Sequence, residues 1–265
     1  MNKISFPVFT EFVEKITTET SLSINKCFDT NIVNKRKKCD GTIVTDVDLN
    51  TEHYIRKNIE TSYPSHGILG EELINEEKSA ESVWIIDPID GTFSFARGIP
   101  LFGTLIGYLY DESPTYGCMR LPKLGNDLLV GDNDSCFLNG ISTKCSSFVS
   151  WDEALILTTD EKSLAQSSIA SNWQMLKKRE AQFRTWGDCY GYYLLCTGKA
   201  DAMLDIDLKP YDILPLIPIL KGAGLSIVDF SKKKDYTSIL ACKPEIKEET
   251  SQDFTEVNFD DLGKD

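Results

Sequence analysis

Apolar residues recur with two different periods along this chain, and each period predicts a different kind of element. Over residues 7–17 they return every three or four positions, which predicts an amphipathic helix. Residues 22–32 keep this character and are expected to form a further helical stretch. The basic run Lys35–Lys38 then favours a solvated loop. Another helix is expected over residues 49–62, since its apolar residues share one face and Pro64 lies beyond its end.

Short apolar runs between turn residues predict strands in the rest of the first half. The expected strands cover residues 67–70, 83–86, 103–110, 116–119 and 127–130. The pairs Gly125-Asn126 and Asn139-Gly140 are typical of hairpin turns. Strands and turns this closely spaced indicate an antiparallel sheet.

From about Cys145 the pattern changes, and strands alternate with helices. The expected strands are residues 154–158, 183–185, 202–204 and 225–228, and the expected helices are residues 163–178, 189–197 and 212–221. Pro215 and Pro218 argue against the last helix, because each removes a backbone donor. This alternation indicates a layered α/β arrangement. We therefore expect an N-terminal α+β half (1–148), a C-terminal α/β half (149–243) and an acidic, flexible tail (244–265).

Composition narrows the class of protein. The chain has 265 residues, 41% of them hydrophobic, which suffices for a substantial core. A net charge of −13 excludes non-specific binding to nucleic acid or to an anionic membrane, and no apolar run approaches the length of a membrane span. The eight cysteines are scattered without a Cys-x-x-Cys pair, so we expect reduced thiols in a soluble, cytoplasmic protein and no zinc knuckle.

One stretch carries candidate chemistry. The apolar run Val83–Ile86 predicts a buried strand that ends in Asp87-Pro88-Ile89-Asp90-Gly91-Thr92, where Pro88 stops sheet pairing and Thr92 caps a helix. Two carboxylates beside the open amides of a helix start suit a divalent cation next to a phosphate. Asp-x-x-Asp-Gly by itself is more typical of a surface turn than of a metal site.

The whole string Asp87–Phe95 resembles the first signature of the inositol monophosphatase superfamily of metal-dependent phosphatases. Three further segments, Val44–Asp48, Gly70–Glu72 and Lys209–Pro215, are similar to its other motifs in the same order. The last departs from the family pattern, because Tyr211 stands where Trp is usual and the small residues are lost. The resemblance spans about residues 9–242. It implies an α+β fold, namely an α/β/α/β/α layered sandwich with an antiparallel sheet in the N-terminal half and a mixed sheet in the C-terminal half, and a homodimer.

The resemblance also implies roles for particular residues. Two or three Mg²⁺ ions would be held by Glu71, Asp87, Asp90, Asp212 and the carbonyl of Ile89. Asp48 and Thr92, together with Glu71, would orient the attacking water and accept its proton, and the amides of Gly91 and Thr92 would hold phosphate oxygens. Taken alone, Asp46, Asp48 and Asp212 are typical helix-start acids, and Glu71-Glu72 is a typical surface pair. The implied reaction is hydrolysis of a phosphomonoester by direct attack of water.

The substrate is less closely defined. Residues 187–192 and Lys209–Asp212 resemble the histidinol-phosphatase branch of the superfamily. Asp188 would pair with the amine of histidinol phosphate, and Asp205 stands where the family often has a substrate-contacting Glu. Asp188 is equally placed to be the N-cap of the helix that follows it. Inositol 1-phosphate, other sugar or nucleotide phosphates, and a binding protein without turnover are the alternatives. His53 and His66 lie away from the motifs, so packing or exposed positions are expected for them.

Overall fold

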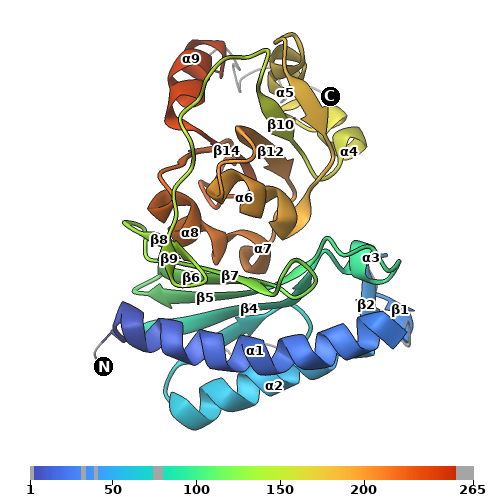
Figure 1. Cartoon of the computed structure of the whole chain (residues 1–265), viewed down its shortest axis with the longest axis vertical. Helices are drawn as coiled ribbons and strands as arrows, with labels where there is room; N and C mark the ends of the chain where they lie inside the picture. Colours follow the sequence, from blue (N-terminus) through green and yellow to red (C-terminus); the bar gives the residue numbers. More distant parts are fainter. Residues whose placement is uncertain (1–2, 31–33, 39–40, 74–79, 255–265) are drawn as a thin grey trace.

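Two β-sheets and three layers of helices build the protein (Figure 1). The computed structural model describes residues 3–30, 34–38, 41–73 and 80–254. From the N-terminal side outward, the layers are a helix pair, a seven-stranded sheet, a set of short helices, a five-stranded sheet and an outer set of helices. This is the α/β/α/β/α sandwich that the sequence predicts.

The first layer consists of α1 (Phe6–Thr30) and α2 (Asp46–Ser62). The prediction of two separate helical stretches before residue 33 is wrong, because α1 is continuous. Its buried face continues through the small polar residues Thr17, Thr20 and Ser21, which an apolar pattern does not register. The Thr17 hydroxyl donates to the carbonyl of Val13 at 2.6 Å, so burial leaves that hydroxyl satisfied.

The seven-stranded sheet has its strands in sequence order. They are β3 (Gly67–Gly70), β4 (Ser82–Asp90), β5 (Gly103–Tyr110), β6 (Ser113–Leu121), β7 (Asp127–Gly131), β8 (Cys136–Leu138) and β9 (Ile141–Ser142). Neighbouring strands are antiparallel except β3 and β4, which are parallel. The largely antiparallel sheet predicted for the first half is therefore confirmed.

Two local predictions in this half are wrong. The basic run does not form a loop, because Lys35–Lys37 is a strand (β1) that pairs with β2 (Ile43–Thr45) in a two-stranded ribbon. Such a ribbon is held by backbone hydrogen bonds and does not need an apolar face. Pro88 also does not end β4. The register shifts between Asp87 and Asp90, and the missing donor of Pro88 falls in this irregularity while the strand continues to Asp90.

The five-stranded sheet is mixed, as predicted. Its order is β11-β10-β12-β14-β13, with bounds β10 (Leu155–Leu157), β11 (Gln182–Arg184), β12 (Ala202–Ile206), β13 (Ser226–Asp229) and β14 (Ser238–Cys242). β10 is parallel to both of its neighbours, whereas β14 is antiparallel to β12 and β13. The prediction lacks β14, which lies inside the sheet.

The helices of this half are α4 (Glu161–Ala165), α5 (Ala170–Lys177), α6 (Asp188–Cys196), α7 (Pro210–Ile213), α8 (Leu216–Gly222) and α9 (Pro244–Phe254). In this half α6 forms where a helix was predicted over residues 189–197, whereas the helices predicted over residues 163–178 and 212–221 are each divided. The predicted helix over residues 212–221 divides at Pro215, which becomes the N-cap of α8. Pro218 is tolerated because it lies in the first turn, where its amide has no intrahelical acceptor.

The flexible tail predicted from residue 244 is wrong as far as Phe254, since α9 forms there with Ile246 fully buried. Residues 255–265 lie outside the described part of the chain, as do Cys39 and most of the acidic segment around residues 75–81. Trp151 Nε1 donates to Glu249 at 2.6 Å. Ile246 therefore anchors the helix to the apolar cluster beneath it, and Glu249 anchors it to the connection before β10.

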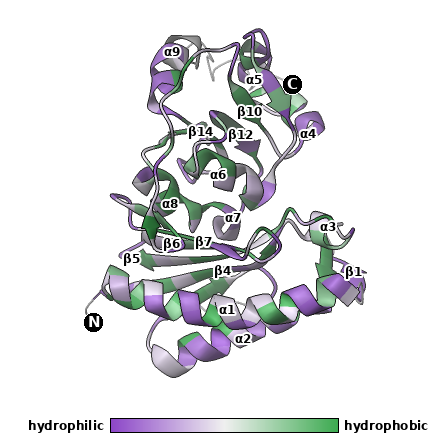
Figure 2. Ribbon diagram, viewed as in Figure 1, coloured by the Kyte–Doolittle hydropathy of each residue, from purple (hydrophilic) through white to green (hydrophobic). Residues whose placement is uncertain are grey.

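Three of the four apolar clusters among the described residues fill the spaces between layers, and the fourth packs α3 against the N-terminal helices. Of the first three, one lies between the N-terminal helices and the first sheet, one between the two sheets, and one under the outer helices. Figure 2 shows that the strands of both sheets and α8 are mainly hydrophobic, whereas α2 and α9 carry many hydrophilic residues. His66 lies beside the cluster between the N-terminal helices and the first sheet, where its Nδ1 accepts a hydrogen bond from Trp84 Nε1 at 3.0 Å. Packing is therefore the role of His66, as expected.

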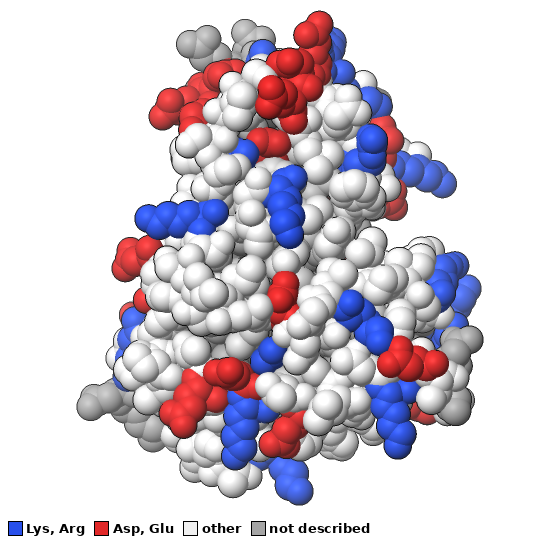
Figure 3. Space-filling model, viewed as in Figure 1, with Lys and Arg blue, Asp and Glu red and all other residues white. Residues whose placement is uncertain are grey.

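On the face drawn in Figure 3, acidic and basic side chains are interspersed, with no single acidic patch. The seven cysteines in the described part of the chain are free thiols. None of the helices described here combines the length and hydropathy of a membrane span.

Candidate active site

A cleft of about 290 Å³ lies where the two halves meet. Half of its sixteen lining residues are acidic, and none of the described residues that line it is basic. The acidic residues are Glu71, Asp87, Asp90, Asp160, Asp188, Asp205, Asp207 and Asp212. They come from the ends of β3, β4 and β12 and the starts of α4, α6 and α7. The fold therefore brings together acids that are far apart in sequence.

Three of these acids form a compact group at the centre of the cleft. One carboxylate oxygen each from Asp87, Asp90 and Asp212 lies within 4.8 Å of the others. Asp87 is only 1% exposed, and its Oδ1 has no hydrogen-bond partner among the described residues. Burial, followed by the neighbouring carboxylates, raises the pKa of Asp87 and Asp90 well above the usual range. Burial likewise raises the pKa of Asp212 to about 7.

This group fits a hard divalent cation. Its donors are all carboxylate oxygens, which Mg²⁺ prefers, and three negative charges so close together are costly without a counter-ion. The unpartnered Oδ1 of Asp87 is a buried acceptor that a cation would satisfy. The predicted ligands Ile89 and Glu71 line the same cleft.

The turn after β4 places these ligands. Gly91 has φ of +88°, and a Cβ there would lie 2.9 Å from the carbonyl of Leu101, so only glycine fits without strain. Gly91 is also the N-cap of α3 (Thr92–Phe95). The prediction that Thr92 is the cap is therefore wrong, and Thr92 is the first helical residue. On the other side, the amide of Cys189 in α6 donates to Asp90 Oδ2 and fixes that carboxylate.

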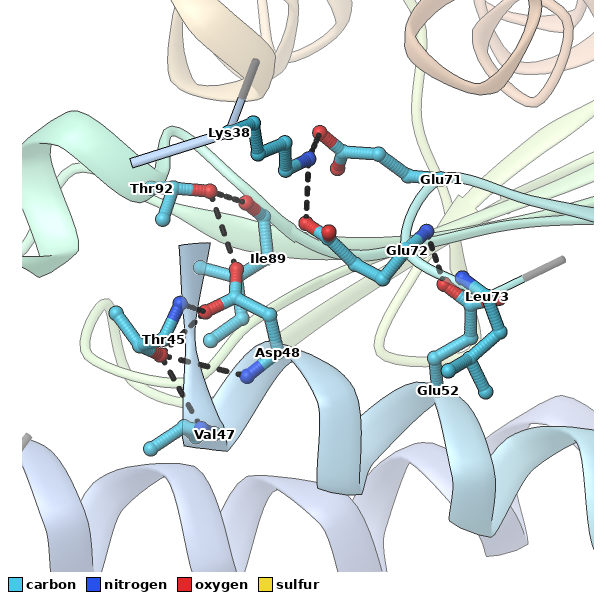
Figure 4. A network of polar contacts seen from close by, with 10 residues as sticks. All are labelled: Lys38, Thr45, Val47, Asp48, Glu52, Glu71, Glu72, Leu73, Ile89 and Thr92. Atoms are coloured by element: carbon cyan, nitrogen blue, oxygen red, sulfur yellow. Dashed lines mark hydrogen bonds and ion pairs between the residues drawn. The ribbon is translucent and has the colours of Figure 1, made fainter. Parts of the chain in front are cut away.

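Asp48 lies directly behind Thr92 (Figure 4). Thr92 Oγ1 is 3.1 Å from Asp48 Oδ1 and 2.8 Å from the carbonyl of Ile89, and it donates its one proton to either acceptor. Asp48 Oδ2 accepts from the amide of Thr45 at 2.9 Å, and Thr45 is the N-cap of α2. Asp48 is therefore a capping residue through one oxygen and a neighbour of the cleft through the other. Burial raises its pKa to about 6.

Asp46, the neighbouring acid, takes no part in this arrangement. It accepts hydrogen bonds from Arg36 and Asn34, both at 2.8 Å, and lies outside the cleft. Asp46 is the first residue of α2, which confirms it as a helix-start acid, and the N-cap of that helix is Thr45.

Lys38 is a member of the site that the sequence does not reveal. Its Nζ lies 2.7 Å from Glu71 Oε1 and 2.8 Å from Glu72 Oε1 (Figure 4). Burial alone would lower the pKa of Lys38, but the hydrogen bonds to the two glutamates raise it above its usual value. The prediction that Lys35–Lys38 is solvated is thus wrong at Lys38. Its ammonium group pairs with Glu71 and Glu72, which follow it by more than thirty residues.

The far wall of the cleft carries Asp188 and Asp205. The N-cap of α6 is Gly187, and Asp188 is its first helical residue with φ of +50°, so the capping interpretation of Asp188 is wrong. The Thr159 hydroxyl donates to Asp205 Oδ2 at 2.8 Å and accepts from the amide of Asp188 at 3.1 Å. Burial raises the pKa of Asp188 to about 6 and that of Asp205 to about 7.

Several lining residues were not predicted. They are Thr159, Asp160, Ser163, Tyr192 and Asp207. Asp160 is the N-cap of α4, a pattern that predicts a helix start and nothing further. Tyr192 lies in the stretch 187–192 that was singled out, but as a buried helix residue. The others have the sequence signals of ordinary helix caps and turn residues, because their position on the cleft depends on the packing of the second sheet.

Comparison with known proteins identifies the family of this chain. The sequence profile of the inositol monophosphatase family matches residues 7–257. The chain is 32% identical to a histidinol-phosphatase of Chlorobaculum parvum over 193 residues, 73% of this chain and 74% of that protein. It is 36% identical to the bifunctional phosphatase IMPL2 of Arabidopsis thaliana over 200 residues, 74% of this chain and 57% of that protein. Among solved structures, the fold matches the suhB protein of Bartonella henselae with a TM-score of 0.84 at 17% identity, covering 92% of this chain and 97% of that one. An inositol monophosphatase of Zymomonas mobilis matches with a TM-score of 0.77 at 25% identity, covering 94% and 98%.

Proposed function

Because this chain belongs to the inositol monophosphatase family and is a metal-dependent phosphoric monoester hydrolase, we propose that its substrate is a small phosphorylated alcohol bearing a cationic group. The first candidate is L-histidinol phosphate. The observation that carries the proposal is the excess of acids in the cleft. Four of the eight acids, Glu71, Asp87, Asp90 and Asp212, would be balanced by two Mg²⁺ ions.

The other four acids differ in exposure. Asp160 and Asp207 are exposed to solvent, whereas Asp205 is buried and Asp188 half-buried, and no basic residue described in the cleft lining balances these two. A neutral polyol would leave these carboxylates uncompensated, whereas an ammonium or imidazolium group would pair with them. Similarity to the histidinol-phosphatase of Chlorobaculum parvum supports the same substrate class.

The residues of the cleft have distinct tasks in this proposal. Glu71, Asp87, Asp90, Asp212 and the Ile89 carbonyl hold two or three Mg²⁺ ions. Bound Mg²⁺ supplies charge that polarises the phosphate and lowers the pKa of water from about 15.7. The amides of Gly91 and Thr92 orient phosphate oxygens at the start of α3.

Proton transfer is the task of Thr92 and Asp48. When Thr92 Oγ1 donates to Asp48, its lone pairs are free to accept a hydrogen bond from the attacking water, whose proton then passes to Asp48 through the hydroxyl. With a pKa of about 6, Asp48 is ionised at neutral pH and still basic enough to receive that proton. No covalent phosphoenzyme is needed, because water is the nucleophile.

A second candidate substrate is inositol 1-phosphate. The match to the inositol monophosphatase of Zymomonas mobilis favours it, and the geometry around Asp87, Asp90 and Asp212 suits any phosphomonoester. A binding protein without turnover is the third possibility, motivated by Tyr211 and the altered motif around it. We also infer a homodimer from the family resemblance, which light scattering after size-exclusion chromatography would test.

The test is phosphate release in Mg²⁺ with histidinol phosphate and inositol 1-phosphate compared side by side. We expect a higher kcat/KM for histidinol phosphate, and Asp188→Asn should raise its KM about tenfold or more while changing the polyol phosphate little. Preference for inositol 1-phosphate, unchanged by Asp188→Asn, would refute the cationic substrate. Binding of either compound without phosphate release would refute the hydrolase role.

A further inference from the structure

The turn that carries Glu71 is fastened to the middle of α2. Glu52 Oε2 accepts from the amide of Glu72 at 2.7 Å, and its Oε1 accepts from the amide of Leu73 at 3.3 Å (Figure 4). Arg56, one turn further along α2, donates from Nε to Glu52 Oε1 at 2.7 Å and from Nη2 to the carbonyl of Leu73 at 3.4 Å. We refer to Glu52, Arg56 and these backbone groups as the α2 clasp.

The α2 clasp is buried and tightly fitted. Glu52 is fully buried and Arg56 is 8% exposed, so the pair is shielded from water and its hydrogen bonds have no solvent replacement. A Cβ at Gly70 would overlap the Glu52 carboxylate and lie 2.8 Å from Arg56 Nη2. The carboxylate thus occupies the space of a side chain at Gly70. This explains why glycine precedes the glutamate pair.

A second anchor holds the turn from the sheet side. The amide of Glu71 donates to the carbonyl of Ile86 at 3.1 Å, continuing the parallel pairing of β3 with β4. Glu71 is therefore fixed by the sheet at its own amide and by the α2 clasp at the next two amides. Its carboxylate lies at the edge of the cleft, where it is the second-largest cause of the raised pKa of Asp87.

We infer that Glu52 is a positioning residue, which with Arg56 sets the place of Glu71 among the acidic ligands. The inference rests on the proposed function, because Glu71 needs a fixed place only if it holds an ion. Ligating groups held by a buried hydrogen-bond partner bind metal more tightly than loose ones, and loss of such a partner typically costs about 10–100-fold in metal affinity. Glu52 does not touch the cleft and therefore acts only through the turn.

The experiment compares Glu52→Ala, Glu52→Gln and Gly70→Ala with the control Glu60→Gln, which changes an exposed glutamate on the same helix. Three quantities are measured: amide hydrogen exchange over residues 70–73 in metal-free protein, affinity for Mn²⁺ by electron paramagnetic resonance, and kcat at saturating Mg²⁺. Glu52→Ala and Gly70→Ala should exchange faster and bind Mn²⁺ about 10–100-fold more weakly. Their kcat at saturating Mg²⁺ should stay near the wild-type value. Glu52→Gln keeps one acceptor oxygen, so its exchange rate and Mn²⁺ affinity should lie between those of Glu52→Ala and the wild type. Glu60→Gln should match the wild type in both.

The outcomes separate this inference from the function it rests on. Wild-type Mn²⁺ affinity in Glu52→Gln and Gly70→Ala, even with a lower Tm, would show a merely structural role for Glu52 and overturn the inference alone. These two variants decide the matter if Glu52→Ala does not fold. Absence of Mn²⁺ binding in the wild-type protein would refute the proposed function, and the inference with it.

Discussion

The cluster of Asp87, Asp90 and Asp212 should make the metal-free protein less stable than a variant with one carboxylate fewer. The pKa of Asp212 rises from 3.8 to about 7 on folding, chiefly through burial. The folded protein therefore holds a proton on Asp212 between about pH 4 and pH 7 that the unfolded chain has released. Stability without metal falls as the pH rises through this window, and above pH 7 the loss is complete.

The size of the effect follows from the pKa change. A rise from 3.8 to about 7 corresponds to about 4 kcal/mol against the ionised form. Asp212→Asn removes this cost, but its amide oxygen accepts the hydrogen bond from Lys209 less strongly than a carboxylate does, a loss of about 1–2 kcal/mol. We expect a net gain of about 2 kcal/mol at pH 8 in EDTA, or a Tm higher by about 4–8 °C.

Calorimetry in EDTA at pH 8 and pH 5, with and without Mg²⁺, measures this effect. At pH 5 the cost in the wild type falls to about 1.6 kcal/mol, which the weaker hydrogen bond of the variant offsets, so the net gain should vanish. Added Mg²⁺ should stabilise the wild type more than the variant. Asp134→Asn, at an exposed position, is the matched control and should change the Tm little at either pH. A variant that is destabilised equally at both pH values would refute the repulsion on which the proposed metal site depends.

Three further predictions concern single residues of the site. Asp48→Asn should lower kcat about 10²–10⁴-fold and abolish the rise in rate through about pH 6, while Mg²⁺ still raises the Tm; a retained pH profile would contradict its role as proton acceptor. Lys38→Met should tighten Mn²⁺ binding, because it removes the ammonium that neutralises Glu71; weaker binding measured by titration would show that the lysine supports the ion instead. Gly91→Ala should cost more stability in denaturant unfolding than Gly98→Ala. Both have positive φ, worth about 1–2 kcal/mol, but only Gly91 also lacks room for a Cβ. Equal costs would mean that the Leu101 carbonyl moves freely.

Elements with a clear apolar period were predictable, and those with mixed faces were not. β4 and β5 are runs of apolar residues and form where expected. α1 was underestimated because buried threonine and serine extend its inner face. α9 was missed because it is a polar helix with few buried residues, Ile246 and Thr250 among them. Its polar and acidic composition resembles that of a flexible tail.

β14 is a different kind of omission. Its residues Ser238–Cys242 carry the same apolar signal as the other buried strands, and four of the five are buried. The apolar pattern of this strand can be seen in the sequence, but its place in the sheet cannot. β14 lies between β12 and β13 although it follows both in sequence. Pairing between strands distant in the chain is decided by the packing of the whole sheet.

The sequence by itself determined the local chemistry: an apolar strand followed by Asp87 and Asp90, a glycine at Gly91 that allows the turn, and single acids such as Glu71, Asp188 and Asp212 in short motifs. Only the tertiary structure decided that Asp212 lies within 4.8 Å of the first two, that Lys38 neutralises Glu71, and that Asp188 is not a cap. The physical reason is that burial and charge repulsion depend on neighbours that the chain brings from far away. A carboxylate that has an ordinary pKa in its own segment acquires a raised pKa, and can be stabilised by a cation, only when folding buries it beside other carboxylates.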